Sequence, residues 1–283
     1  MVGGHRDERY IAINGNIVRE AEASIRILGR GTNGADGVYE SVFISRSKMI
    51  DLSAHVNRLY DSCAFLKLDL YFDISALESI IAILIEKNGL ADAYAVATIV
   101  VMRAGEPGAL SSPEEAMYII TVGQAGISSE LYTNGISLSL AHVPAYNPLA
   151  EHPTLSCLQN TLLFAEARRS GFDDALVVMQ GKILECTQAN IFIYRDGAVR
   201  TPVSGVLPGI TRNHVVLIAG SLGYDVLFDE IESDELWSAA EVFVSDTVRG
   251  IVPVTRVGNV TFPVGTLTRS LVDTCNAARS VSF

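Results

Sequence analysis

The sequence has few of the features that mark disulfide-bonded, zinc-binding or nucleic-acid-binding proteins. Its four cysteines, Cys63, Cys157, Cys186 and Cys275, are scattered without CxxC spacing, so we expect neither a zinc site nor a disulfide framework. The formal net charge is −11, which repels nucleic acid and anionic membrane surfaces. The sequence contains no run of lysine and arginine that would form a local basic patch. Internal repeats and low-complexity segments are also absent from the sequence.

The first ten residues lack a long hydrophobic run. They are polar and charged, and contain no apolar stretch of the length that a signal peptide or a membrane span requires. We therefore expect a cytoplasmic protein whose partners are neither nucleic acids nor membranes.

Lysine is scarce in this chain. The only lysines are Lys48, Lys67, Lys87 and Lys182, and the stretch 151–158, which reads EHPTLSCL, contains none. Few side chains can therefore supply a primary amine.

The first half of the chain alternates strand and helix patterns. With 283 residues and 49% hydrophobic composition, the chain is long enough for one large domain or two of ordinary size. Apolar periodicity and turn residues predict a hairpin at 10–18, strands at 37–45, 95–102 and 117–122, a helix that begins with Ser53 as its N-cap, and a second helix at 74–86.

The second half repeats this mixture after a looser segment rich in Gly, Ser, Asn and Pro. We predict helices at 158–170 and 211–222, and strands at 175–179, 183–184, 189–194, 240–245 and 251–255. The fold class is therefore α/β, or a mixed α+β arrangement. We expect an N-terminal α/β domain at 1–123, an interdomain connection at 124–148 and a C-terminal cofactor-binding domain at 149–283.

Several short motifs occur in a characteristic order. They are GVYE at 37–40, HVNRL at 55–59, GKILECTQANIF at 181–192, LPGITR at 207–212 and FVSDT at 243–247, the last followed by IVPV at 251–254. Together they resemble the class IV aminotransferases, a pyridoxal-phosphate (PLP) family with branched-chain aminotransferases, D-amino acid transaminases and aminodeoxychorismate lyases. The resemblance implies a two-domain fold-type IV enzyme with its cofactor site at the domain junction.

The resemblance also implies ligands and site residues. It implies a homodimer that binds pyridoxal or pyridoxamine 5′-phosphate (PMP) and acts on a small-molecule amine or keto acid. By the same resemblance, the cofactor-binding residues are Arg58, Glu185, Asn190, Ile210, Thr211 and Thr247, and Tyr39 lines the substrate side.

The chemistry of these side chains suits their implied roles. A guanidinium such as that of Arg58 can hold phosphate oxygens in a bidentate fork. The carboxylate of Glu185 would keep the pyridine nitrogen protonated, which makes the ring an electron acceptor. A helix that starts just after LPG would present unpaired N–H groups, with Ile210 and Thr211 as the expected donors.

The chain departs from the family at the lysine that holds the cofactor as a Schiff base. Counting back from Glu166-Ala167 by the family's spacings leads to Pro153 or to His152. His152 is the candidate base at the lysine position, because an imidazole titrates near neutral pH; alternatively it is a loop histidine beside a proline, without a role. The arginine and histidine that trap the carboxylate in D-amino acid transaminases have no counterpart beyond Arg103, so that substrate class is not supported.

Three functions remain open from the sequence. The first is a class IV protein that binds PLP or PMP noncovalently, with amine transfer slowed or altered by the missing lysine. The second is a catalytically silent homologue that serves as a binding or partner subunit. The third is an enzyme that uses Cys157 or Cys186 as a nucleophile.

Overall fold

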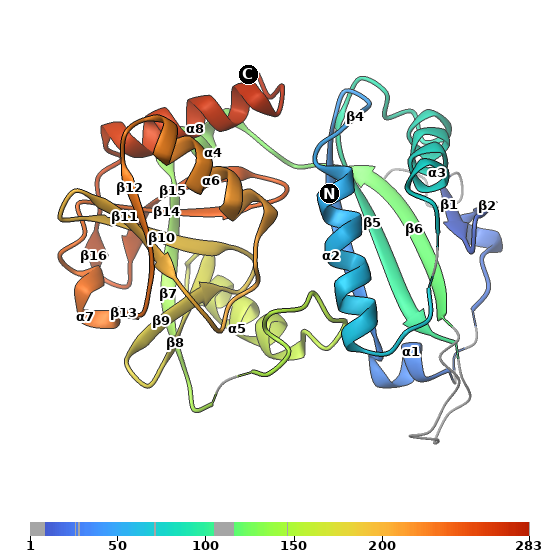
Figure 1. Ribbon diagram of the computed structural model, residues 1–283, viewed down its shortest axis with the longest axis horizontal. Helices are drawn as coiled ribbons and strands as arrows, with labels where there is room; N and C mark the ends of the chain where they lie inside the picture. Colours follow the sequence, from blue (N-terminus) through green and yellow to red (C-terminus); the bar gives the residue numbers. More distant parts are fainter. Residues whose placement is uncertain are drawn as a thin grey trace. The chain divides into compact units, whose positions relative to one another are not determined.

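The computed structural model describes residues 9–25, 27, 29–70, 72–104, 116–145 and 147–282. Two compact units divide the chain: the first contains the described residues up to Gly126 together with His152–Ser156, and the second contains Ile127–Glu151 and the chain from Cys157 onward. Both units combine sheets and helices (Figure 1). The predicted mixed α/β class is confirmed.

The first unit is built on an antiparallel sheet of six described strands in the order β2-β1-β6-β5-β3-β4. The strands are β1 Tyr10–Ile13, β2 Asn16–Arg19, β3 Gly37–Ser45, β4 Lys48–Met49, β5 Tyr94–Arg103 and β6 Ala116–Gln124. The helices are η2 Glu20–Glu22, α1 Arg30–Gly34, α2 Leu52–Phe65 and α3 Ile74–Lys87. The predicted hairpin is present, and Asn14 and Gly15 turn it with positive φ angles of 49° and 81°.

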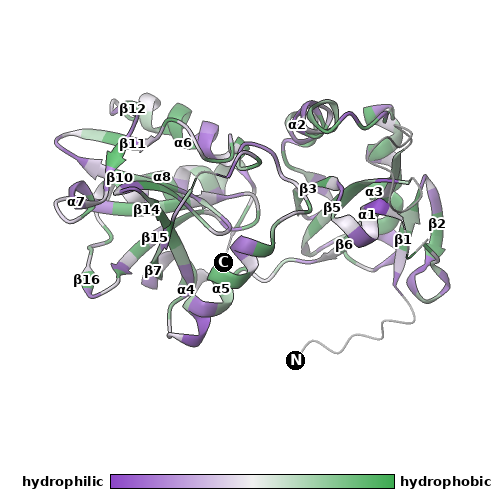
Figure 2. Ribbon diagram, turned by 90° about the horizontal axis from the view of Figure 1, so that it is seen from below, coloured by the Kyte–Doolittle hydropathy of each residue, from purple (hydrophilic) through white to green (hydrophobic). Residues whose placement is uncertain are grey.

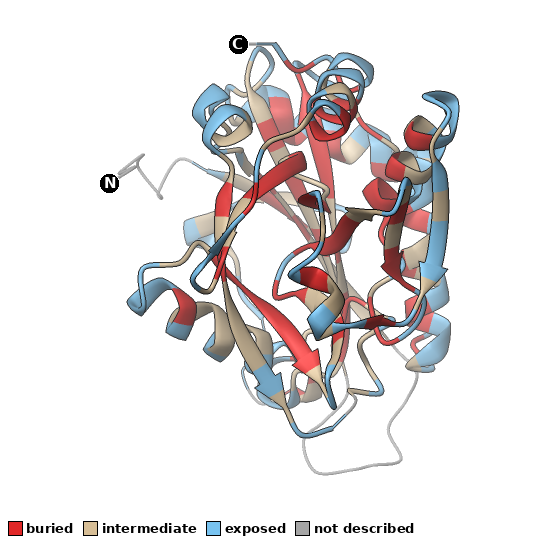
Figure 3. Ribbon diagram, turned by 90° about the vertical axis from the view of Figure 1, so that its left-hand side faces the viewer, coloured by how far each residue is buried: buried red, intermediate tan, exposed pale blue. Residues whose placement is uncertain are grey.

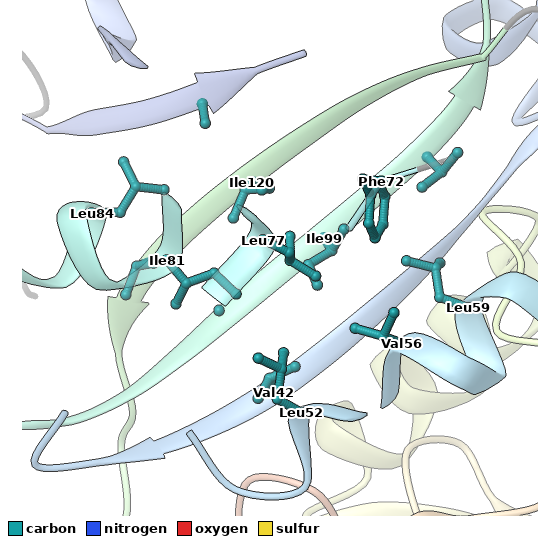
Figure 4. Packing of buried hydrophobic residues seen from close by; sticks show 14 of the residues in the cluster. Val42, Leu52, Val56, Leu59, Phe72, Leu77, Ile81, Leu84, Ile99 and Ile120 are labelled. Atoms are coloured by element: carbon teal, nitrogen blue, oxygen red, sulfur yellow. The ribbon is translucent and has the colours of Figure 1, made fainter. Parts of the chain in front are cut away.

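The core of the first unit lies between its sheet and the helices α2 and α3. Val56 and Leu59 from α2 and Leu77 from α3 pack in one cluster with strand residues such as Ile99 (Figure 4). These apolar residues recur at helical spacing, which is why both helices lie on the sheet. The fixed helix α2 is important because it carries Arg58 and the neighbours of His152.

The start of α2 differs from the prediction. The helix begins at Leu52, and its N-cap is Asp51, which has a left-handed backbone with a φ of 57°. Ser53 therefore lies inside the first turn and is not the N-cap. A short, tight entry from β4 imposes this geometry, since only three residues, 50 to 52, separate Met49 from Ser53.

The second unit contains a mixed sheet of ten described strands, in the order β12-β11-β10-β14-β15-β7-β8-β9-β13 with β16 paired to β15. Its strands are β7 Ile136–Val143, β8 Asp174–Met179, β9 Lys182–Cys186, β10 Asn190–Arg195, β11 Ala198–Pro202, β12 Asp225–Asp229, β13 Ile231–Glu232, β14 Glu241–Asp246, β15 Gly250–Val257 and β16 Val260–Thr261. Its helices are α4 Ser129–Asn134, α5 Leu158–Arg169, α6 Ile210–Ser221, α7 Ser233–Leu236 and α8 Thr266–Ala278.

Two apolar clusters hold the second unit together. One lies among the strands, and the other joins β10 and β14 to α6 and α8 through residues such as Phe192, Phe243 and Leu271. Phe192 and Phe243 stack with ring centroids 5.0 Å apart. Hydrophobic colouring follows the central strands in Figure 2, and in Figure 3 these strands are mostly buried while the helices expose their outer faces. The loops at the strand ends are thus carried on a rigid base.

The segment 124–148, expected as a connection, contains a strand of the second unit. β7 pairs in parallel with β15 on one side and β8 on the other, and its Leu138 is fully buried. His152–Ser156, in contrast, joins the first unit: Pro153 O accepts a hydrogen bond from Tyr39 N, and Leu155 N donates one to Gly37 O. The chain therefore passes between the units more often than a single connection would require.

No described helix of the protein combines the length and the apolar character needed to cross a lipid bilayer.

Candidate active site

Glu185 is held in a fixed orientation at the end of β9. Its Oε2 accepts hydrogen bonds from Asn190 Nδ2 and from Leu207 N, each at 3.0 Å. These donors come from the start of β10 and from the loop before α6, so two further segments converge on the carboxylate that β9 carries. A carboxylate fixed by two donors is suited to holding a proton on a ligand's ring nitrogen.

Asn190 joins the same group to the loop that leads into α6. Its Nδ2 also donates to Leu207 O at 2.9 Å, and its side chain is buried. A Cβ added to Gly209 would overlap the Asn190 side-chain oxygen, so only glycine lets the loop approach this closely. Asn190 thus positions both Glu185 and the start of α6.

The start of α6 forms an anion-binding geometry in the second unit. Gly209 is the N-cap, and the helix runs for 12 residues from Ile210, so the first N–H groups, including those of Ile210 and Thr211, have no intrahelical acceptor. The helix dipole adds positive potential at this end. The predicted helix at 211–222 is confirmed and begins one residue earlier.

Arg212 anchors the first turn of α6 to β11. Its guanidinium is buried, donates from Nε to Thr201 Oγ1 at 3.2 Å and from Nη2 to Pro202 O, and lies 4.8 Å from the centre of the Phe228 ring. Burial lowers the pKa of Arg212, and the attraction of Glu185 opposes that shift. These contacts fix the helix start against β11.

Thr247 lies just past the end of β14. Asn190 pairs with Ser245 in the sheet, so Thr247, two residues farther, is at the same sheet end as Asn190. Asp246 Oδ1 accepts from Val248 N at 2.9 Å and from Arg249 N at 2.8 Å, which closes the turn. Thr247 therefore lies at the same end of the strands as Asn190, which is also a predicted cofactor-binding residue.

The first unit holds Arg58 on α2 by a buried carboxylate. Arg58 Nε donates to Glu40 Oε1 at 2.6 Å and Nη2 to Glu40 Oε2 at 3.0 Å, while His55 Nδ1 lies 2.7 Å from the same Oε2. Burial by itself raises the pKa of the Glu40 carboxyl, but the hydrogen bonds from His55 and Arg58 outweigh it and lower the pKa below its ordinary value. The ionised Glu40 therefore orients the Arg58 guanidinium.

Tyr39 and His152 also belong to the first unit and are linked through the backbone. Tyr39 is half-buried on β3 and its N–H donates to Pro153 O at 2.8 Å. His152 Nδ1 is 3.2 Å from Ser62 Oγ, and its ring stacks on Phe65 with centroids 4.0 Å apart and planes 18° apart. His152 is thus a positioned side chain with contacts to α2.

Arg103 has a structural environment in the first unit. Its Nε donates to Asp36 Oδ2 at 3.0 Å, and its Nη1 and Nη2 donate to Lys67 O and Leu66 O at 3.2 and 2.7 Å. These carbonyls follow the last turn of α2. The buried Arg103 therefore ties the end of α2 to the start of β3.

The two cysteines considered as nucleophiles differ in environment. Cys186 is buried, and this burial, reinforced by the Asp174 carboxylate, raises the pKa of its thiol well above the ordinary value. A buried thiol with a raised pKa is a poor nucleophile. Cys157 is exposed at the start of α5.

Several residues of this arrangement were missed by sequence reasoning. Glu40 lies inside the GVYE motif, whose pattern does not reveal its bonds to α2, and Asp246 carries the turn chemistry typical of aspartate. Ser62, Phe65 and Arg279 had no motif. Arg279 Nη2 donates to Val248 O at 2.8 Å and to Thr247 O from 32 residues away, a contact that only the fold brings about.

Comparison with known proteins identifies the family of the chain. The family described as Amino-transferase class IV matches residues 37–257. The branched-chain-amino-acid aminotransferase of Escherichia coli K12 is 28% identical over 265 residues, which cover 89% of this chain and 85% of that protein. The chain belongs to the class IV aminotransferase family.

Solved structures of the family share the fold. The branched-chain aminotransferase of Thermoproteus uzoniensis, solved with norvaline, has a TM-score of 0.88 at 24% identity and covers 96% of this chain and 94% of its own. A T.th. branched-chain amino acid aminotransferase, solved with pyridoxamine 5′-phosphate, has a TM-score of 0.87 at 25% identity over the same shares. The predicted fold-type IV architecture is confirmed.

Proposed function

We propose that this protein binds PLP or PMP without a covalent bond and that its amine transfer is slow or altered. The observation that carries the proposal is the fixed carboxylate of Glu185, bonded to Asn190 and Leu207 beside the first turn of α6. A fixed acid and a helix start with unpaired N–H groups are what a protonated ring nitrogen and a phosphate require. The residues present therefore fit the cofactor.

Each of these residues has a defined task in the proposal, through its side chain or its backbone. The bound cofactor supplies an electron-accepting ring. Glu185 holds the proton on the ring nitrogen, and Asn190 keeps Glu185 in place. Ile210 and Thr211 donate N–H groups to the phosphate, and Arg58 and Thr247 add side-chain donors. Tyr39 lines the substrate side.

The proposed slow or altered amine transfer follows from the absence of a lysine at 151–158. Lys182, the lysine of the second unit, is engaged at the surface by Glu230 with an Nζ to Oε2 distance of 2.5 Å. We propose that His152 takes over the movement of a proton, while no group takes over the covalent attachment. A positioned base alone contributes roughly 10²- to 10⁴-fold in rate.

A second candidate function is a catalytically silent homologue that serves as a binding or partner subunit. The same lysine-free segment favours it.

The substrate in the first case is a small-molecule amine or keto acid, as the names of the relatives suggest. A homodimer and a cytoplasmic location complete the proposal, both from the family resemblance and the sequence.

Binding of the cofactor is tested by titrating the purified protein with PLP and PMP and following absorbance. We expect saturable binding of both without a borohydride-reducible bond to the protein. Glu185→Gln is expected to weaken binding by about 1.5 to 3 kcal/mol, or roughly 12- to 150-fold, because a charged hydrogen bond to the ring is lost. Exposed Glu166→Gln is the matched control. Equal, non-saturable absorbance changes in both variants would favour the silent homologue.

Gly209→Ala should weaken binding of the phosphate. The new Cβ overlaps the Asn190 side chain, so Asn190 and the start of α6 must move apart. Overpacking of this kind costs about 1 to 3 kcal/mol, and we expect roughly 5- to 150-fold weaker binding of PMP by calorimetry. Gly220→Ala lies in the same helix, where a Cβ meets no atom within 4 Å, and should bind PMP as the wild type does. Similar losses of PMP affinity in both variants would show that the stability of α6 is responsible, and not the close contact between Gly209 and Asn190.

A further inference from the structure

The surroundings of His152 select one form of its ring. Ser62 lies on α2 with its side chain fully buried, and its Oγ is close to two groups: Arg58 O at 2.8 Å and His152 Nδ1 at 3.2 Å. A serine hydroxyl has one proton to donate and lone pairs to accept with. Which of the two groups accepts the hydroxyl proton of Ser62 therefore decides which His152 nitrogen carries hydrogen.

The two distances assign the proton of Ser62. The 2.8 Å contact to Arg58 O is typical of an O–H donating to a carbonyl, and it is the common bond from a helix serine to the carbonyl four residues earlier. The 3.2 Å contact is at the long end of the range for an N–H donating to oxygen. Ser62 Oγ thus donates to Arg58 and accepts from His152, which places the hydrogen of the neutral ring on Nδ1.

Other contacts fix the plane of the ring and the backbone that carries it. The Phe65 ring stacks on His152 at 4.0 Å, and the chain on either side is fixed because His152 O accepts from Thr154 N at 2.8 Å and Pro153 O accepts from Tyr39 N. Thr154 also forms a bridge with Val38 of β3. Within the described part of the chain, no residue forms a hydrogen bond with His152 Nε2.

We propose that Ser62 is a positioning residue that holds His152 in the Nδ1–H form, so that Nε2 carries the lone pair and is the basic nitrogen. Phe65 fixes the plane of the ring. The inference rests on the proposed function only for the role of His152 as a base; the protonation pattern itself is a property of the folded chain. An Nε2–H ring would instead require the Ser62 hydroxyl to leave Arg58 O and donate to Nδ1.

Nuclear magnetic resonance of the histidine nitrogens tests the proposal in the full chain without cofactor, under conditions in which the ring is neutral. With ¹⁵N-labelled histidine, long-range proton–nitrogen correlation distinguishes Nδ1–H from Nε2–H rings. The His152 signals are identified as those lost in His152→Gln. His55 serves as an internal reference, because the ionised Glu40 carboxylate accepts from its Nδ1.

We expect the wild type to show a single Nδ1–H form for His152. Ser62→Ala should shift it to a mixture of both forms, and Ser62→Thr, which keeps the hydroxyl, should restore the Nδ1–H form. Ser79→Ala removes a serine that makes the same bond to Ser75 O at 2.8 Å on α3, and should leave His152 unchanged. An Nε2–H form in the wild type, or an unchanged Nδ1–H form in Ser62→Ala, would overturn the proposal.

Activity separates this inference from the proposed function. If amine transfer is measurable, Ser62→Ala should lower kcat with little change in the cofactor affinity, and Ser62→Thr should recover it. A wild-type protein with the Nδ1–H form and no detectable amine transfer would leave the inference intact and count against the proposed enzyme.

Discussion

Replacing His152 by lysine is expected to give a protein that captures PLP covalently. Residue 152 occupies the family's lysine position under the longer spacing from Glu166-Ala167. The segment around it is fixed by backbone hydrogen bonds to Gly37 and Tyr39, so the substitution changes a side chain on a backbone that is already ordered. The introduced primary amine supplies what stretch 151–158 lacks, namely a group able to attach the cofactor and to move a proton.

The measurement for His152→Lys is borohydride reduction followed by mass analysis of peptides. We expect the reduced cofactor on the peptide containing residue 152, and amine transfer raised by roughly 10²- to 10⁴-fold over the wild type, the usual contribution of a positioned acid–base group. The wild type should show no such peptide. Loss of the ring stacking with Phe65 is a modest cost by comparison, of about 0.5 to 1.5 kcal/mol.

Two further variants make this result interpretable. His142→Lys introduces the same side chain at an exposed position of β7 and should give no reduced peptide and no gain in rate. Pro153→Lys tests the shorter family spacing. A reduced peptide in Pro153→Lys but not in His152→Lys would move the lysine position by one residue, and none in either would contradict the interpretation of 151–158 as the segment that faces the cofactor.

Local patterns located most of the elements that carry the candidate site. The helices α3, α5 and α6 begin within one residue of their predicted starts, because apolar spacing and glycine stops act within a few residues. Asn190 and the LPGITR loop lie at a strand start and a helix start, as predicted, whereas Glu185 lies inside β9, which extends beyond the predicted strand 183–184. What these segments share is that each is encoded within a short window.

The missed parts depend on contacts between distant residues. β7 lies in a segment rich in turn residues, and its parallel pairing with β8 and with β15, the latter over a hundred residues later, makes it a strand. His152 and Ser62 are 90 residues apart, and the sequence alone gives no reason to join them. The sequence leaves Arg103 as the one arginine that could bind a carboxylate, and its partners at the end of α2 become visible only in the folded unit.

Glu40→Gln is expected to cause a large loss of stability. Glu40 is 1% exposed and bonds both Arg58 and His55, so removing its charge leaves a largely buried guanidinium without its counter-ion. Breaking a buried ion pair from one side costs about 3 to 5 kcal/mol. The free energy of unfolding, measured in urea, should fall by that amount at pH 7. Glu78→Gln, an exposed glutamate on α3, should change it little.

The pH dependence of this difference follows from the pKa of Glu40. That pKa is lower in the folded protein than the ordinary value of 4.5, so the folded protein binds the proton less tightly than the unfolded chain. The stabilisation by Glu40 is therefore complete above about pH 4.5 and is lost as the pH falls through the lower folded pKa. The free energies of unfolding of the wild type and Glu40→Gln should converge in acid. A difference between them that stayed constant from pH 7 to pH 3 would show that Glu40 acts by shape rather than by charge.

Because Arg58 depends on Glu40 for its orientation, Glu40→Gln should also weaken phosphate binding at pH 7, whereas Glu78→Gln should not.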